Sequence, residues 1–238
     1  MNFFKNPFFA PKAIRNAECF DVELANWEYI GTGMIRSCYR VPGQLVCVKF
    51  YRTTEKADRD WKWDTYWRVR LTRHLFWTNI NMQEWRYYER LKKRLPAALM
   101  AVFPDKIEPV YSTRLGWGLK ETLLVNYDGS PVHSVVKQMQ RFTDEQDKEA
   151  LFRRVSELIG QIIQYYVAIH DPQNILVQWI DAQQYQLRIV DFEPRTKAIV
   201  PGLTYIRPFI RRRVNNRCVR YLKLVRQGMV MGFGDEED

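Results

Sequence analysis

The stretch VAIHDPQNILVQW, residues 167–179, places a cluster of polar side chains between two apolar runs. His170, Asp171 and Asn174 lie on one short turn, and a second apolar run, LRIVDFEP, carries Asp191. Carboxylate and amide oxygens are hard ligands of the kind that Mg²⁺ prefers, often together with substrate phosphates. Asn and Asp also build turns at strand ends without binding a ligand. The spacing therefore supports two interpretations, a metal or phosphate site and simple turn chemistry.

Two strands and a long helix are expected to position this turn. The run ILVQW and the run YQLRIVDF, divided by a polar turn at residues 181–184, have the β-branched and aromatic content of strands. From Asp144 to Tyr166, apolar residues recur with helical spacing. The polar turn thus connects the end of a helix to a strand hairpin.

The first half of the chain predicts an antiparallel sheet with one inserted helix. Residues 22–30 and 44–51 are typical of strands, and the segment GTGMIRSCYR leads into another between them. The runs IEPVYST and GWGLKETLLVNYDG, divided by a turn, predict a hairpin. Residues 80–95 show helical spacing that stops at Pro96. This order predicts an α+β chain in two lobes.

Composition describes a folded protein without a membrane span. Of 238 residues, 46% are apolar and 14% aromatic, which is typical of a chain with a packed core. No run approaches the roughly 20 apolar residues that cross a bilayer. The opening segment is broken by Lys5, Pro7 and Pro11, so it lacks the apolar core of a signal peptide. The 4 cysteines have no metal-binding spacing and predict reduced thiols in a cytoplasmic protein.

The positive charge is concentrated near the C-terminus. The formal net charge is +10, and residues 194–234 contain 10 basic residues and no Asp or Glu. Such a segment is expected to attract a polyanion, such as an anionic glycolipid, a membrane surface or nucleic acid. The alternative is a C-terminal helix whose apolar face completes the core and whose charges face water. Both interpretations stay open for the segment RPFIRRRVNNRCVRYLKLV.

Several features occur in the order found in protein kinases. IGTGMIRSCY is a partial G-x-G-x-x-G, VCVKF resembles the V-A-I-K strand, Glu84 lies in the next helix, and HDPQNIL and VDF follow. Together they resemble the protein-kinase-like fold. More closely, GTG…CY, VKFY, EWRYYERLKKRL and PQNIL resemble the PhoP regulatory network protein YrbL family. The resemblance covers the chain from about residue 28 to its end.

The resemblance implies a two-lobed protein-kinase-like fold with a shortened C-lobe. Residues 1–21 would be an N-terminal arm, and residues 22–128 a kinase-like N-lobe. The N-lobe carries an insertion at 52–80 that is rich in Trp and Arg, a composition that suits stacking on bases or sugars, seating at a membrane interface, or simply covering the sheet. Residues 129–238 would form the short C-lobe with the basic C-terminal segment.

The resemblance also implies a site for ATP in the N-lobe. Gly31, Thr32 and Gly33 would let the backbone approach the nucleotide phosphates. Lys49 would neutralise phosphate charge, and Glu84 would hold the Lys49 ammonium through an ion pair.

The same resemblance assigns four further residues. Asn126 and Tyr127 fall where a kinase-like hinge would contact the adenine. Asn174 and Asp191 would bind Mg²⁺ as oxygen ligands.

Three departures from the kinase pattern bear on catalysis. Arg36 replaces the third glycine of the loop, and Glu193 replaces the glycine after Asp191 and Phe192. Kinases place the proton-accepting Asp five residues before the metal-binding Asn, and here that position is Ile169. Either the base is missing, or a shortened loop brings Asp171 into its role. Loss of a positioned base typically costs about 10²- to 10⁴-fold in rate.

Three functions are therefore expected to compete. The first is a small-molecule or glycolipid kinase that uses Asp171, Asn174 and Asp191 with ATP and Mg²⁺. The second is a regulatory pseudokinase that binds a partner through its basic and aromatic surfaces. The third is a nucleic-acid binder. Only 47 residues follow Asp191, too few to present a peptide as a protein kinase does. The protein is expected in the cytoplasm, or at the inner membrane as a peripheral protein if the substrate is a glycolipid.

Overall fold

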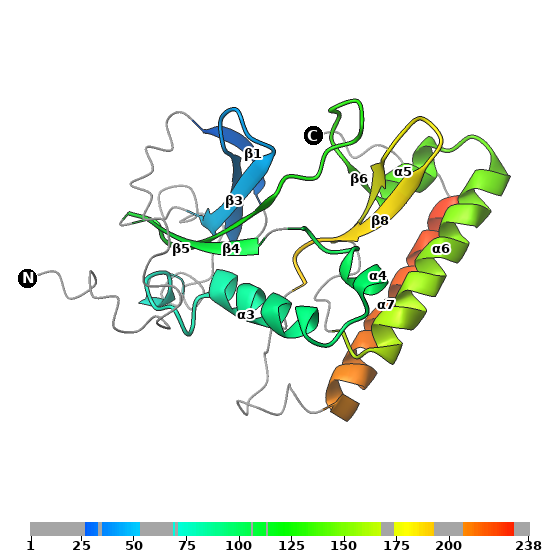
Figure 1. Cartoon of the computed structure of the whole chain (residues 1–238). Coiled ribbons are helices and arrows are strands. Elements are labelled where there is room, and N and C mark those ends of the chain that lie inside the picture. The colour runs from blue at the N-terminus through cyan, green and yellow to red at the C-terminus, as the bar shows by residue number, and fades with distance from the viewer. Residues whose placement is uncertain are drawn as a thin grey trace, which may run out of the picture. The chain divides into compact units, whose positions relative to one another are not determined.

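The computed structural model describes residues 27–32, 35–52, 69, 71–105, 107–112, 114–167, 174–192 and 207–230. The described chain is α+β, as predicted, and its strands pair antiparallel in two sheets (Figure 1). It divides into two compact units. The first holds the described residues up to Arg90 together with Pro104–Leu123, and the second holds Leu91–Phe103 and the described residues from Leu124 onward. The lobe boundary at residue 128 that the resemblance implies stays a prediction.

The first unit is built on a five-stranded sheet with the order β1-β2-β3-β5-β4. Its strands are β1 Glu28–Thr32, β2 Arg36–Arg40, β3 Val46–Tyr51, β4 Ile107–Ser112 and β5 Gly116–Thr122. The central strand β3 is buried almost throughout, in keeping with its Val, Phe and Tyr content. Val48 and Phe50 pack with Val110 and Leu115 on one face of the sheet. Alternation along β3 directs Lys49 to the other face.

Helix α3, Ile80–Lys92, confirms the helix predicted from residue 80. Its start is fixed by Asn79, whose side-chain oxygen accepts hydrogen bonds from the N–H groups of Asn81 (2.9 Å) and Met82 (3.4 Å). The Asn79 amide in turn donates to the carbonyl oxygens of Arg73 (2.9 Å) and Trp117 (3.3 Å). The first turn of α3 is thereby tied to strand β5.

Of the insertion at 52–80, the structure describes residue 52, residue 69 and residues 71–80. Phe76 is buried and packs with Met82 and Trp117 in the core. Trp77 is half exposed, and the Arg86 guanidinium lies 5.0 Å from its ring centroid. This part of the insertion covers the sheet and α3. Trp61, Trp63 and Trp67 lie outside the described residues, as does the N-terminal arm.

The second unit holds a small sheet of three strands with the order β6-β7-β8. The strands are β6 His133–Ser134, β7 Ile175–Trp179 and β8 Tyr185–Ile189. The helices are α4 Ala97–Met100, α5 Val135–Arg141, α6 Glu145–Gln164 and α7 Arg207–Val230. Helix α6 begins as predicted, because the Asp144 carboxylate accepts a hydrogen bond from Gln146 N–H (2.8 Å).

Helix α7, which contains most of the basic segment, runs alongside α6 and also contacts α5 (Figure 1). Cys218, Tyr221 and Val225 are buried in this packing. The apolar face of α7 therefore completes the core of its unit, one of the two interpretations that the sequence left open. Arg220 and Lys223 lie on the exposed side of the helix. None of the helices in the described ranges is both long and apolar enough to cross a membrane.

Candidate functional site

The two predicted metal ligands come together at one end of the β7–β8 hairpin. Ile175 pairs with Ile189, and the next step of the ladder is a hydrogen bond from Val190 N–H to the Asn174 carbonyl oxygen (3.1 Å). Asp191 follows Val190 directly. Asn174 and Asp191 thus lie on adjacent strand ends, as the sequence spacing predicted.

Asp191 has an unusual backbone conformation. Its φ angle is 53°, in the left-handed region that few residues other than glycine adopt, although Asp tolerates it better than most. Such strain persists only where the surroundings enforce it, and it gathers at functional sites. The anchor is the next residue, Phe192, which is fully buried and packs edge-on against Phe103 with ring centroids 4.7 Å apart. The buried ring therefore holds the Asp191 backbone in place.

Lys49 is paired with a residue that the sequence did not suggest. Its ammonium lies 2.6 Å from the Glu121 carboxylate, and both residues are buried, with 8% and 4% exposed. Glu121 lies on β5 opposite Cys47, so it is the diagonal neighbour of Lys49 on the same face of the sheet. The acid within the otherwise strand-like segment GWGLKET was the one signal that the sequence offered.

Glu84, the expected partner of Lys49, is held by Arg36 instead. The Arg36 guanidinium donates to the Glu84 carboxylate (2.5 Å) and to the Asn81 side-chain oxygen (3.1 Å). Glu84 is fully buried, and Arg36 is 6% exposed. The residue that replaces the third loop glycine is therefore a strand residue of β2 that fixes α3 to the sheet. The expected Lys49–Glu84 ion pair is corrected to two pairs, Arg36–Glu84 and Lys49–Glu121.

The second oxygen of Glu84 accepts no hydrogen bond from any residue of the described chain. A buried carboxylate oxygen without a donor is costly, and it marks a place where an additional donor would be stabilised.

Two thiols lie near the Lys49 pair. The Cys47 sulfur is 3.8 Å from the Glu121 carboxylate. A hydrogen bond with Cys38, burial and the nearby carboxylate raise the pKa of the Cys47 thiol far above its usual range. Cys47 therefore stays protonated and is no nucleophile, because the thiolate is the reactive form.

Gly31 and Thr32 lie in strand β1, with Gly31 opposite Cys38. A Cβ added at Gly31 would meet no atom within 4 Å. Packing of the described chain therefore gives no reason for a glycine at this position, and approach of nucleotide phosphates to Gly31 stays a prediction. Gly33 lies outside the described residues.

Asn126 builds a turn with its side chain. The amide donates to the Ser130 hydroxyl and the Pro131 carbonyl oxygen, each at 2.9 Å, and its oxygen accepts from Trp179 N–H at 2.9 Å. Tyr127 N–H donates to the Trp179 carbonyl oxygen, and the Tyr127 side chain is 58% exposed. Both residues have a structural role here, and their contact with adenine stays a prediction.

The oxygen donors at the hairpin end fit Mg²⁺ held jointly with phosphates. Mg²⁺ usually takes one or two protein oxygens and completes its shell with water and phosphate oxygens. Asn174 and Asp191 would supply two such oxygens, and their binding of Mg²⁺ stays a prediction. The described ranges contain no group of three or more His, Cys, Asp or Glu side chains arranged to hold a metal by themselves. Asp171, the third predicted catalytic residue, lies outside these ranges.

Comparison with protein families identifies the chain. Residues 22–227 match the model of the family described as PhoP regulatory network protein YrbL. A search of curated proteins gives no match. The family match spans most of the 238 residues. The chain therefore belongs to the PhoP regulatory network protein YrbL family.

Proposed function

We propose that this chain binds ATP and Mg²⁺ in a kinase-like fold and acts as a regulatory protein with weak or no phosphotransfer. The observation that carries the proposal is the juxtaposition of Asn174 and Asp191 across the end of the β7–β8 hairpin, with Asp191 in a strained backbone conformation. Bound Mg²⁺ would neutralise phosphate charge at these two oxygens. The regulatory role agrees with the family description.

Lys49 is the phosphate-binding residue in this proposal. Its ammonium now faces Glu121 at 2.6 Å, so a nucleotide phosphate has to compete with that carboxylate. A phosphate carries more negative charge than a carboxylate, so it can compete with Glu121 for the Lys49 ammonium. Gly31 leaves open space for the phosphates.

Weak phosphotransfer follows from the position of Ile169. An isoleucine cannot accept the proton of an acceptor hydroxyl, and Asp171 is the nearest acid in the sequence. If Asp171 acts as the base, the acceptor in this proposal is a small molecule or a glycolipid.

Thermal unfolding with and without Mg²⁺ and ATP tests the proposal. Ligand at 100 times its dissociation constant stabilises a protein by about 2.7 kcal/mol, which raises the melting temperature by several degrees. The rise should disappear with EDTA and in the Lys49→Ala and Asp191→Asn variants. Asp147→Asn, which changes an exposed acid of α6, is the matched control and should keep the full rise. If ATP and Mg²⁺ do not raise the melting temperature of the parent protein, the proposal is wrong. Release of ADP at more than a trace rate, lost in Asp171→Asn, would instead support an active kinase.

A second function is favoured by helix α7. Its Arg220 and Lys223 are exposed while its apolar face is buried, so the basic charge is displayed on a rigid element. Binding to vesicles containing phosphatidylserine should weaken steeply with salt and fall in the Arg220→Gln/Lys223→Gln variant. Arg153→Gln, an exposed arginine on α6, is the control. An affinity for vesicles that does not change with salt concentration, or that falls equally in the control variant, would exclude this function.

A further inference from the structure

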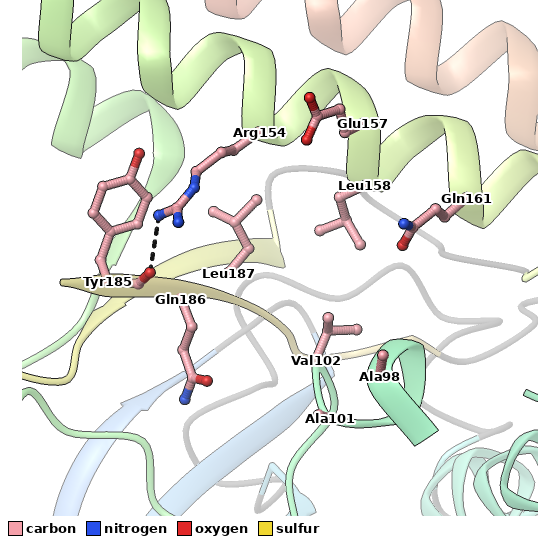
Figure 2. A pocket seen from close by; sticks show the side chains of 10 residues that line it. All are labelled: Ala98, Ala101, Val102, Arg154, Glu157, Leu158, Gln161, Tyr185, Gln186 and Leu187. Atoms are coloured by element: carbon pink, nitrogen blue, oxygen red, sulfur yellow. Dashed lines mark hydrogen bonds between the residues drawn. The ribbon is translucent and has the colours of Figure 1, made fainter. Parts of the chain in front are cut away.

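A pocket of about 310 Å³ opens in the second unit, and neither Asn174 nor Asp191 is among the residues that line it (Figure 2). Helix α6, strand β8 and the chain around α4 form its walls. The floor is apolar and consists of Val102, Leu158 and Leu187, while Arg154 and Glu157 project from α6 at the rim. The pocket is distinct from the proposed nucleotide site and needs a separate account.

Strand β8 is the edge of its three-stranded sheet, and two hydrogen bonds show which of its backbone groups face the pocket. Ile189 N–H donates to the Val102 carbonyl oxygen (2.7 Å), and the Tyr185 carbonyl oxygen accepts from the Arg154 guanidinium (3.1 Å). Residues 185 and 189 therefore turn their backbone groups away from β7. Alternation along an antiparallel strand then directs the N–H and C=O of Leu187 to the same side, into the pocket.

Arg154 supplies a positive charge at one end of this edge. Its guanidinium lies 4.6 Å from the centroid of the Tyr185 ring, and one N–H binds the Tyr185 carbonyl oxygen (Figure 2). Arginine has five N–H donors, so several remain available. Within the described chain no carboxylate forms an ion pair with Arg154, although Glu157 lies three residues later on α6. The stacked, exposed guanidinium is preorganised to receive an anion.

We propose that this pocket binds an extended peptide segment of a partner protein that carries an acidic residue close to an apolar one. One peptide residue takes both backbone hydrogen bonds of Leu187, as in the addition of a strand to a sheet edge. The apolar side chain of this residue lies on the same face as that of Leu187 and covers Leu158, and an acidic side chain two residues along the peptide binds Arg154 (Figure 2). The Arg154 and Ile189 hydrogen bonds close the edge on either side of Leu187, so the pocket holds only a short stretch of peptide.

An array of amidated, N-acetylated hexapeptides tests the proposal. Peptides that combine Asp or Glu with Leu, Ile or Val should bind best, and replacing their acid by its amide should weaken binding by about tenfold or more. Arg154→Gln should cause the same loss and make the acid and amide peptides equal. The neighbouring Arg153→Gln, which changes an exposed arginine outside the pocket, should keep the discrimination. Equal losses in both variants would show unspecific attraction to a basic surface and overturn the proposal.

Amide hydrogen exchange gives a readout of the sheet edge itself. The amide hydrogen of Leu187 should exchange more slowly when the best peptide is bound, whereas methylating the peptide backbone nitrogens should abolish both binding and protection. Binding without protection of Leu187 would exclude edge docking. A selection of peptides without an acid, or no binding by any peptide, would refute the proposal as well.

Discussion

The residues around Lys49 form two buried ion pairs, Arg36–Glu84 between β2 and α3 and Lys49–Glu121 between β3 and β5. Removing charges from water costs several kcal/mol per ion, and the pairing offsets this cost only while both partners remain. Each pair therefore makes its members strongly dependent on each other. The Arg36–Glu84 pair fixes α3 to the sheet, and the Lys49–Glu121 pair joins β3 to β5. Any ligand of the Lys49 ammonium therefore competes with the Glu121 carboxylate.

Arg36→Met should destabilise the protein by about 3–5 kcal/mol, because Glu84 would remain as a buried charge without a partner. The double variant Arg36→Met/Glu84→Met should recover most of this loss, since two apolar side chains replace a buried pair at little cost. Chemical denaturation measures both. Arg40→Met, which breaks the exposed pair with Glu28, is the control and should cost less than about 1 kcal/mol. A double variant as unstable as the single one would show that packing, not charge, governs this contact.

Glu121→Gln should increase the affinity for ATP and Mg²⁺. The change keeps the size of the side chain but removes the negative charge that competes for Lys49, and a charge-assisted contact of this kind corresponds to roughly a tenfold difference. Isothermal titration gives the dissociation constant. The control is Glu108→Gln. Glu108 lies on β4 and pairs with Lys120, which precedes Glu121 on β5, so this variant should leave the affinity for ATP and Mg²⁺ unchanged. Unchanged affinity in Glu121→Gln would show that Glu121 does not restrain Lys49.

At the scale of elements, long periodic segments were predictable and short ones were not. The stripe from Leu151 onward specified α6, and ILVQW gave β7 with its observed bounds. Helix α4 has 4 residues and β6 has 2, too few to show a period. The sequence also placed Asn174 and Asp191 correctly at neighbouring strand ends. It could not identify Glu121 as the partner of Lys49, because diagonal contacts depend on strand register and strand order.

Helix α6 ends in a conformation that its sequence resists. Tyr166 N–H bonds to the Ile163 carbonyl oxygen (3.2 Å) and Val167 N–H to that of Ile162 (2.9 Å), which is the pattern of a Schellman motif. Glycine usually occupies the position of Tyr166, whose φ is 52°. In the sequence, this strained residue precedes Asp171 and Asn174.

Tyr166→Gly should raise the free energy of unfolding by about 0.5–1 kcal/mol, since a left-handed residue costs roughly 1–2 kcal/mol and the half-buried ring returns part of that. The stability curve in urea measures the change. Tyr165→Gly is the matched control: Tyr165 has a φ of −90°, so glycine relieves no strain there and should destabilise. A loss of stability in both variants would show that the Tyr166 ring contributes more than the backbone strain costs.

At the scale of the whole molecule, the positive charge is concentrated in the C-terminal segment and is not spread evenly along the chain. The ten basic residues of the C-terminal segment account for the net charge of +10, whereas the buried pairs of the first unit are balanced. The sequence showed the excess of positive charge, but it did not show which of the basic side chains are exposed. Helix packing decided that Cys218 and Tyr221 turn inward and Lys223 outward. The division of the chain into two units, with 91–103 returned to the second, also depends on contacts that no local pattern encodes.

Acid should weaken the first unit through His74. Burial, followed by the nearby Arg73 guanidinium, lowers the pKa of this histidine from its ordinary value of 6.5, and its Nδ1 lies 3.2 Å from the Tyr111 hydroxyl. The unfolded chain therefore binds a proton at a higher pH than the folded chain, so stability falls as the pH drops below 6.5. Thermal unfolding measured between pH 7.5 and pH 5 should show this decline in stability. This range extends from about one unit above to about 1.5 units below the histidine pKa of the unfolded chain.

His74→Gln should flatten the decline, because glutamine can still bind Tyr111 but takes up no proton. His133, which has its pKa lowered by burial and by Arg141 and Lys137, belongs to the second unit, and His133→Gln is the matched control for the first. Hydrogen exchange can follow the unfolding of each unit separately. Each variant should then reduce the loss of stability at low pH in its own unit and leave the other unit unchanged. A decline that persists unchanged in His74→Gln would show that His74 is not the source of the acid sensitivity of the first unit.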